Sequence, residues 1–298
     1  MTMEKSLLRF TALDGNYMKL DGGAVFGNAP KALWSRWMQP DDRNMINIAS
    51  RTLLIEMQDH KILFETGAGA YLSPDMKKRF QIVENHHVLL ESLNKKGLSH
   101  EDITHVILSH LHFDHAGGLL RQWEETQTGL ELLFPNAQFV VGKTNFERSR
   151  SPHMRDKASF IPDLANLLEE SNRLTFVKDQ DRLTLGELEI EFIESQGHTP
   201  GMISSYIRMQ ALKIFFAGDI APGHAWINLP ITMGYDRFPE GLIDEKRKIF
   251  QRVFKDEAWI FYTHDNTYAA SKLLFDETKK KFQPINLIKD LDQLKTAG

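Results

Sequence analysis

Ser109-His-Leu-His-Phe-Asp-His115 is the most informative segment of this chain, because it carries four side chains that can bind metal: His110, His112, Asp114 and His115. Four such side chains within six residues are far beyond chance in a chain of 298 residues with 12 histidines. In an extended backbone alternate side chains point the same way, so the first three would face one side and His115 another. We expect the segment to hold metal, and one such segment can serve two ions.

The residues around this cluster place it in a loop between two regular elements. Residues 104–109 have the apolar pattern of a strand, and residues 116–120, with two glycines, predict a tight turn into a helix. Ligands carried on a loop between rigid elements are a common arrangement in catalytic sites. A buried loop of this kind without metal would leave many polar groups unpaired, which favours the metal site.

Three more candidate ligands lie far along the chain, and each comes directly after an apolar run of strand length. His198 follows residues 188–193, Asp219 follows residues 213–216, and His264 follows residues 259–262. Because each stands at the end of a strand, we expect them to converge on one edge of the packed sheets. The chain has no cysteine, so any metal must be held by histidine nitrogen and carboxylate oxygen.

Apolar patterning predicts a mixed α/β (α+β) chain. Strand-length apolar runs occur at 52–57, 61–64, 106–108, 138–141, 188–193, 204–208, 213–217 and 259–262. Apolar residues three or four apart predict helices at 88–93, 161–168 and 242–254. Strand pairs punctuated by helices in both halves suggest two packed sheets with helices outside. No repeat or linker marks a boundary, so residues 1–298 are predicted to form a single domain.

Composition excludes several classes of protein. A hydrophobic content of 42% and a charged content of 26% are ordinary for a globular enzyme. The formal net charge of -4 lacks the basic excess of a nucleic-acid-binding protein, so no such partner is expected. No apolar run reaches the length of about 18 residues that spans a membrane, and the amino terminus lacks the apolar core of a signal peptide. We therefore expect a cytoplasmic protein with no membrane partner.

The order of the seven candidate ligands resembles the pattern of the metallo-β-lactamase superfamily, His-x-His-x-Asp-His followed by a distant His, an Asp and a last His. This resemblance implies a four-layer αββα sandwich and two divalent metal ions. It also implies a ligand set in which one ion is held by His110, His112 and His198, the other by Asp114, His115 and His264, with Asp219 as the bridge. Five His and two Asp suit Zn²⁺, and the same donors accept Mn²⁺, Fe²⁺ or Co²⁺.

Further features favour one branch of that superfamily. The absence of cysteine disfavours β-lactamases with a Cys ligand, and His112 stands where the flavodiiron proteins carry Glu. Lactonases, thioester hydrolases of the glyoxalase II type and phosphoesterases remain. Residues 20–34, 217–225 and 233–239 resemble YtnP-type quorum-quenching lactonases, and that resemblance runs from about Leu20 to Asp265. It implies the opening of lactone rings such as N-acyl homoserine lactones.

The chemistry expected from such a site is hydrolysis. Two divalent ions contribute +4 and the two aspartates −2, so the site stays positive and favours a developing oxyanion. Bound metal lowers the pKa of water to about 7, which supplies hydroxide to attack the ester carbonyl. Asp114 is the candidate proton carrier to the leaving alkoxide. The alternatives are a phosphodiesterase or phosphotriesterase, a thioester hydrolase, and a metal-binding regulator without turnover.

Two departures from the family pattern raise questions about individual residues. Glu65-Thr-Gly67 stands where the superfamily usually has Asp-Thr/Ser-Gly. The contact that this carboxylate makes with a metal ligand is therefore expected to differ. Known acyl-homoserine lactonases have a Tyr shortly after the bridging Asp, but Ile-Ala-Pro follows Asp219 here. His224 and Tyr235 are the candidate catalytic donors in its place.

An extension at about residues 20–45 is predicted to be a loop that contributes to the substrate site. Gly and Pro punctuate it, and it carries Phe26 and Trp34, which are candidates for covering the acyl chain of a small-molecule ester or lactone. The alternative is that these aromatic side chains pack in the core or at a homodimer contact.

Overall fold

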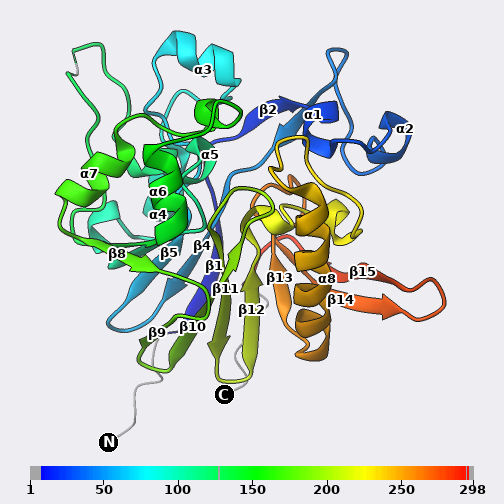
Figure 1. Cartoon of the computed structure of the whole chain (residues 1–298). Coiled ribbons are helices and arrows are strands. Elements are labelled where there is room, and N and C mark those ends of the chain that lie inside the picture. Colours follow the sequence, from blue (N-terminus) through cyan, green and yellow to red (C-terminus); the bar gives the residue numbers. More distant parts are fainter. Residues whose placement is uncertain (1–7, 127, 293, 295–298) are drawn as a thin grey trace, which may run out of the picture.

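The computed structural model describes residues 8–126, 128–292 and 294, and within them the strands form two large sheets and a small one (Figure 1). The first sheet has the spatial order β1 (Arg9–Asp14), β4 (Arg51–Glu56), β5 (Lys61–Phe64), β6 (His105–Leu108), β7 (Gln138–Gly142), β8 (Leu174–Val177). The second has the order β15 (Lys281–Ile288), β14 (Ala270–Asp276), β13 (Trp259–Phe261), β12 (Leu212–Phe216), β11 (Met202–Met209), β10 (Leu188–Ser195), β9 (Arg182–Leu185). The small sheet pairs β2 (Met18–Asp21) with β3 (Met45–Ile48).

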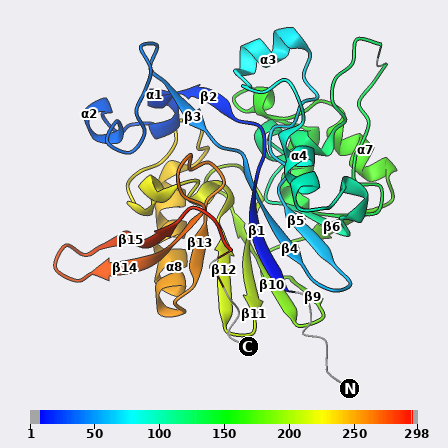
Figure 2. The ribbon, with the colours of Figure 1, turned by 180° about the vertical axis from the view of Figure 1, so that it is seen from behind.

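Some of the helices lie on the outer faces of the two large sheets, and the others lie near one end of the sheets (Figures 1 and 2). The α-helices are α1 (Gly22–Phe26), α2 (Lys31–Trp34), α3 (Pro74–Phe80), α4 (Val88–Lys95), α5 (Phe113–Ala116), α6 (Lys143–Arg150), α7 (Leu164–Glu170) and α8 (Pro239–Lys255). Short 3₁₀ turns are η1 (His100–Asp102), η2 (Gly117–Leu119), η3 (Lys157–Ser159), η4 (Gly218–Ile220) and η5 (His224–Ile227). None of the described helices combines the length and apolar character needed to cross a bilayer.

Three apolar cores separate four layers. Along β10 the alternate residues Leu188, Ile190 and Phe192 are buried in the core between the sheets, as expected for a strand with one buried face. In that same core Phe64 of β5 and Phe216 of β12 lie with ring centroids 5.3 Å apart. The outer cores pack α4 and α7 against the first sheet and α8 against the second. The predicted αββα sandwich is therefore confirmed.

Strand direction decides where the candidate ligands lie. β5, β6, β7 and β8 are parallel, and so are β12 and β13. β10 is antiparallel to β11, which is antiparallel to β12, so β10 runs in the same direction as β12 and β13. The carboxyl ends of these last three strands therefore meet at one edge of the second sheet. Loops at the carboxyl ends of parallel strands are the usual place for a site in sheets of this kind.

Residues 20–45 are not an irregular loop, which corrects the prediction. They contain the end of β2, the helices α1 and α2, and the start of β3. Asp21 organises this segment: one carboxylate oxygen accepts a hydrogen bond from the Ala24 amide at 2.8 Å, which caps α1, and the other accepts one from Asn44 Nδ2 at 2.8 Å. The contact with Asn44 is a tertiary one, so local sequence pattern could not reveal it.

Glu191 of β10 forms ion pairs on the outer face of the second sheet, and their contribution to the stability of the fold can be tested. Its carboxylate accepts hydrogen bonds from Arg252 of α8 at 2.7 and 2.8 Å and from Arg208 of β11 at 3.0 Å. Hydrogen bonds from Arg252, which outweigh the effect of burial, lower the pKa of Glu191 to about 2 from 4.5. Since the folded pKa is the lower one, this contribution is present above pH 4.5 and is lost as the pH falls towards 2.

Glu191→Gln is therefore expected to lower the free energy of unfolding at pH 7 by about 1–2 kcal/mol, a value reduced for solvent screening. Urea titrations at pH 7 and at progressively lower pH measure the difference, which should shrink below pH 4.5. Glu170→Gln at an exposed position is the control. A difference that stays constant with pH would show that packing of Glu191, rather than its charge, is responsible.

Candidate metal centre

All seven candidate ligands lie together at one edge of the two sheets. His110 and His112 are in the loop after β6, and Asp114 and His115 are in α5. His198 comes after β10, Asp219 lies in η4 after β12, and His264 comes after β13. The prediction that His110, His112 and Asp114 would face one side is wrong, because the helix α5 begins at Phe113 and turns Asp114 towards His115.

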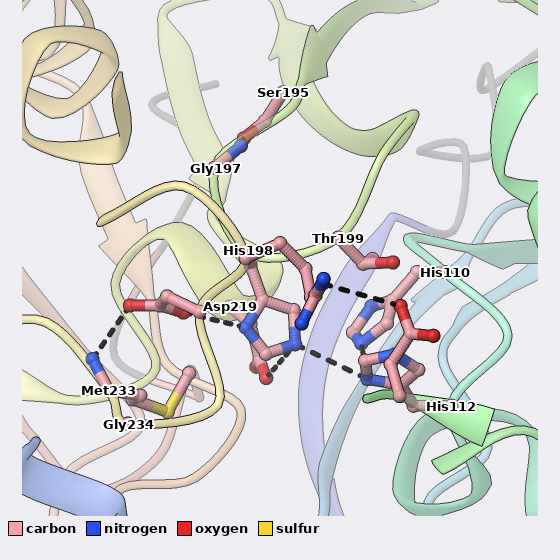
Figure 3. Close-up of polar contacts among 12 residues, drawn as sticks. His110, His112, Ser195, Gly197, His198, Thr199, Asp219, Met233 and Gly234 are labelled. Carbon is pink, nitrogen blue, oxygen red and sulfur yellow. Dashed lines mark hydrogen bonds and ion pairs between the residues drawn. The ribbon is translucent and has the colours of Figure 1, made fainter. Parts of the chain in front are cut away.

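The first group of ligand atoms consists of three buried imidazole nitrogens. His112 Nδ1 lies 3.0 Å from His110 Nε2 and 3.3 Å from His198 Nε2. Figure 3 shows these three rings gathered around one point, with Asp219 beside them. Asp219 Oδ2 is 3.2 Å from His198 Nε2 and adds an oxygen to the group.

The second group consists of two imidazole nitrogens and two carboxylate oxygens. His115 Nε2 lies 3.1 Å from His264 Nε2. Asp114 Oδ2 is 3.5 Å from His264 Nε2, and Asp219 Oδ1 is 3.2 Å from that same nitrogen and 3.4 Å from His115 Nε2. Asp219 therefore directs one oxygen at each group.

The chemistry of these donors fits two divalent cations. Burial and the charges of neighbouring histidines hold the pKa of His110 and His112 well below the usual value, so both present neutral rings with free lone pairs. Burial raises the pKa of Asp219, but His115 and His264 outweigh this and lower it, so the carboxylate is ionised. Asp219 Oδ1 is buried and has no hydrogen-bond partner among the described residues. A cation would satisfy this oxygen and the converging nitrogens at once.

Outer contacts fix the orientation of the histidine rings. His198 Nδ1 is 2.8 Å from Asp236 Oδ1, and Asp236 Oδ2 accepts a hydrogen bond from the Met233 amide at 2.7 Å. His264 Nδ1 donates to the Ala49 carbonyl at 2.7 Å. Such partners fix the tautomer so that the other nitrogen faces the metal. Sequence reasoning missed Asp236, because no spacing rule connects a carboxylate with a histidine 38 residues away.

Glu65 occupies the position where the superfamily usually has Asp, and it contacts the second ligand group. Its Oε2 lies 3.3 Å from His115 Nδ1, and its Oε1 accepts a hydrogen bond from the Ser109 amide at 2.8 Å. The backbone of Glu65 has φ 66°, an unusual value for a residue other than glycine. The longer side chain thus reaches from a left-handed backbone position to orient His115.

A cavity of about 450 Å³ opens onto the ligand groups. Five of the seven candidate ligands form part of its lining: His112, Asp114, His198, Asp219 and His264. Apolar side chains make up much of the rest, namely Met18, Leu20, Val25, Ile48, Phe80, Phe113, Trp226 and Met233. Arg155, Ser159 and Tyr235 add polar groups. A small molecule with an apolar portion would place a polar centre against the ligand groups here.

Phe26 and Trp34 are not among the described residues that line this cavity, which corrects the expectation of direct substrate contact. Both are buried, and their rings stack with centroids 5.4 Å apart. Phe26 also stacks on Trp226 at 4.7 Å. Because α1 directs Val25 into the cavity and Phe26 into the core, the two aromatic residues support the wall from behind.

The two candidate catalytic donors differ in position. Tyr235 lines the cavity with 43% of its surface exposed. His224 is not among the described lining residues, and its Nδ1 is engaged by the carboxylate of Asp265. Asp265 also accepts hydrogen bonds from the amides of Thr267 and Tyr268 at 2.9 Å, so His224 belongs to the contacts that shape the His264 loop.

Comparison with known proteins agrees with this geometry. Residues 48–264 match the model of the metallo-beta-lactamase superfamily. N-acyl homoserine lactonase AiiA of Bacillus thuringiensis subsp. kurstaki is 22% identical over 256 residues, which cover 78% of this chain and 88% of the relative.

Among solved structures, a probable metal-dependent hydrolase from Staphylococcus aureus is 28% identical with a TM-score of 0.82, and the match covers 96% of this chain and 98% of the other. The dizinc quorum-quenching lactonase AidC, solved with a product N-hexanoyl-L-homoserine, is 22% identical with a TM-score of 0.74, covering 94% and 96%. The matched region spans most of the chain and includes every candidate ligand. The chain is thus a metal-dependent hydrolase and belongs to the metallo-beta-lactamase superfamily.

Proposed function

We propose that the chain is a dinuclear metal hydrolase that opens lactone rings such as N-acyl homoserine lactones, and so acts in quorum quenching. The observation that carries this proposal is the position of Asp219, whose two oxygens face two separate ligand groups at the base of a largely apolar cavity. The relatives named as N-acyl homoserine lactonases support the lactone as substrate.

In this proposal His110, His112 and His198 would hold one ion, Asp114, His115 and His264 would hold the other, and Asp219 would contribute an oxygen to each. Zn²⁺ is the proposed metal, because nitrogen-rich sets with carboxylates suit it. Bound ions would supply hydroxide at neutral pH and polarise the ester carbonyl.

The side chains around the ions position the substrate and manage its protons. The apolar lining, including Leu20, Val25 and Phe113, would take the acyl chain and exclude water from it. Asp114, with 15% of its side chain exposed, faces the cavity and would pass a proton to the leaving alkoxide. The Tyr235 hydroxyl is the proposed hydrogen-bond donor to the developing oxyanion.

Tyr235→Phe tests the donor. It removes only the hydroxyl, and we expect kcat for a lactone to fall by about 10–100-fold, the effect typical of losing one such hydrogen bond. Steady-state kinetics and metal content measure the effect and show that the ions remain. His224→Gln is the comparison variant, and its main effect is expected on thermal stability. If kcat fell for His224→Gln and not for Tyr235→Phe, the assignment of the donor would be reversed.

The substrate class is tested with the metal-loaded protein and four compounds: an N-acyl homoserine lactone, a simple δ-lactone, a bis-aryl phosphate and a glutathione-type thioester. We expect about two metal ions per chain by elemental analysis and the highest kcat/KM for a lactone. Turnover of the phosphate alone would identify a phosphodiesterase or phosphotriesterase, and turnover of the thioester alone a thioester hydrolase. Full metal loading without any turnover would favour a metal-binding regulator.

A further inference from the structure

One wall of the cavity carries a positive side chain that the proposed chemistry does not use. Arg155 lines the cavity, and its Nη2 donates a hydrogen bond to the Gly234 carbonyl at 3.2 Å. The Gly234 amide in turn donates to the Ala24 carbonyl at 2.9 Å. These contacts connect three segments that are distant in sequence and hold the guanidinium at the cavity.

Nearby charges leave this wall positive. The carboxylate of Asp156, which also lines the cavity, is bound by Arg148 at 2.8 and 3.1 Å, and Arg237 Nε lies 3.7 Å from it. The two guanidinium groups of Arg148 and Arg237 therefore share this one carboxylate, and the positive charge of Arg155 comes in addition to them. Within the described part of the chain, Arg155 makes no ion pair with an acidic side chain at 4.0 Å or less.

Unsatisfied polar atoms behind the wall add to its positive character. Arg237 Nε and Nη1 are buried and have no hydrogen-bond partner among the described residues. The Arg237 backbone is fixed, because its amide donates to the carbonyls of Gly197 at 3.0 Å and His198 at 3.1 Å. Buried donors without acceptors raise the local positive potential, and the low dielectric of the interior strengthens their effect on an anion in the cavity.

We infer that this wall is an anion subsite in which Arg155 binds a carboxylate group of the substrate. The remaining lining carboxylates, Asp114 and Asp219, belong to the proposed metal set, so no free acidic side chain of the described lining opposes such a group. The planar guanidinium matches a carboxylate with two parallel hydrogen bonds. The inference rests on the proposed function and extends its substrates beyond N-acyl homoserine lactones, which carry no carboxylate, to lactones or esters with a carboxylate besides the reacting carbonyl.

The test compares 5-oxotetrahydrofuran-2-carboxylate with its carboxamide, two γ-lactones of nearly equal shape that differ in charge. For the parent protein we expect kcat/KM at least about tenfold higher for the carboxylate, mainly through KM, as suits a charged hydrogen bond. Arg155→Gln should reduce this ratio to near one, and Arg155→Lys should keep part of it. The ratio should also decline as salt is added. Arg150→Gln, at an exposed position paired with Glu169, is the control and should leave the ratio unchanged.

Calorimetry separates this inference from the proposed function. Cyclopentanecarboxylate and cyclopentanecarboxamide cannot be hydrolysed as lactones. A carboxylate can also bind the metal ions in both proteins, so the difference in affinity between the metal-loaded parent and metal-loaded Arg155→Gln reports the subsite. Loss of about tenfold in carboxylate affinity on this substitution supports the subsite even if no lactone is turned over. Equal turnover of the two lactones, or carboxylate affinity that Arg155→Gln does not change, would overturn the subsite and leave the lactonase proposal standing.

Discussion

Asp219→Asn is expected to reduce kcat/KM for lactone hydrolysis by roughly a thousandfold, which corresponds to about 4 kcal/mol of transition-state stabilisation. The physical reason is that a neutral amide cannot offer an anionic oxygen to both ligand groups, whereas the carboxylate of Asp219 directs Oδ1 at His115 and His264 and Oδ2 at His198. The loss of this negative charge would also leave the repulsion between two cations less screened. Steady-state kinetics and elemental analysis measure the effects, and we expect bound metal to fall together with activity.

The control for this prediction is Asp244→Asn, which removes a carboxylate that is 68% exposed on α8. Both variants should unfold cooperatively, because the side chain of Asn has the shape of Asp and the fold around η4 is retained. If Asp219→Asn kept a full complement of metal and near-parental kcat/KM, Asp219 would not be the bridge.

Lys246→Met is expected to lower the free energy of unfolding by about 3 kcal/mol. Lys246 is fully buried in α8, and its Nζ donates to the carbonyls of Asn228 at 3.3 Å, Leu229 at 3.2 Å and Ile231 at 2.8 Å. Methionine fills a similar volume but leaves three carbonyls without this donor. The corresponding decrease in Tm is roughly 6–12 °C for a chain of this size.

This substitution should also weaken metal binding. The loop that Lys246 holds leads to Asp236, which contacts His198 Nδ1 at 2.8 Å, so a looser loop orients that ring less well. Thermal unfolding and metal titration measure the two effects. Lys248→Met, at an exposed position of the same helix, is the control and should change neither. Parental stability of Lys246→Met would show that water replaces the lost donor.

The architecture and the convergence of the seven candidate ligands could be predicted from sequence because both follow from local pattern. His110, His112, Asp114 and His115 are close in sequence. The three distant candidates follow strands whose apolar patterns are plain, and β10, β12 and β13 run in one direction, so their following loops meet. The strand β6 begins only one residue before the predicted run at 106–108.

Other features depend on tertiary contacts and could not be predicted in this way. The start of α5 at Phe113 changes the side to which Asp114 points, and no residue pattern marks that start. Phe26 and Trp34 are aromatic residues of the kind that often cover an apolar substrate. In the structure, however, Phe26 stacks on Trp34 and on Trp226 and is buried. Asp236 contacts His198 from a loop that hydrogen bonds of Lys246 and of the Met233 amide hold in place.

The ligand groups draw on both halves of the chain, which has a consequence for biosynthesis. The segment from His110 to His115 follows β6 in the first sheet, but each group is completed by a histidine from the second sheet, His198 in one and His264 in the other. During synthesis, the segment from His110 to His115 therefore leaves the ribosome before the histidines that complete the two ligand groups have been made. Each proposed metal site can be complete only after the second sheet has docked, so full occupancy of both sites would mark a chain whose two sheets have already assembled.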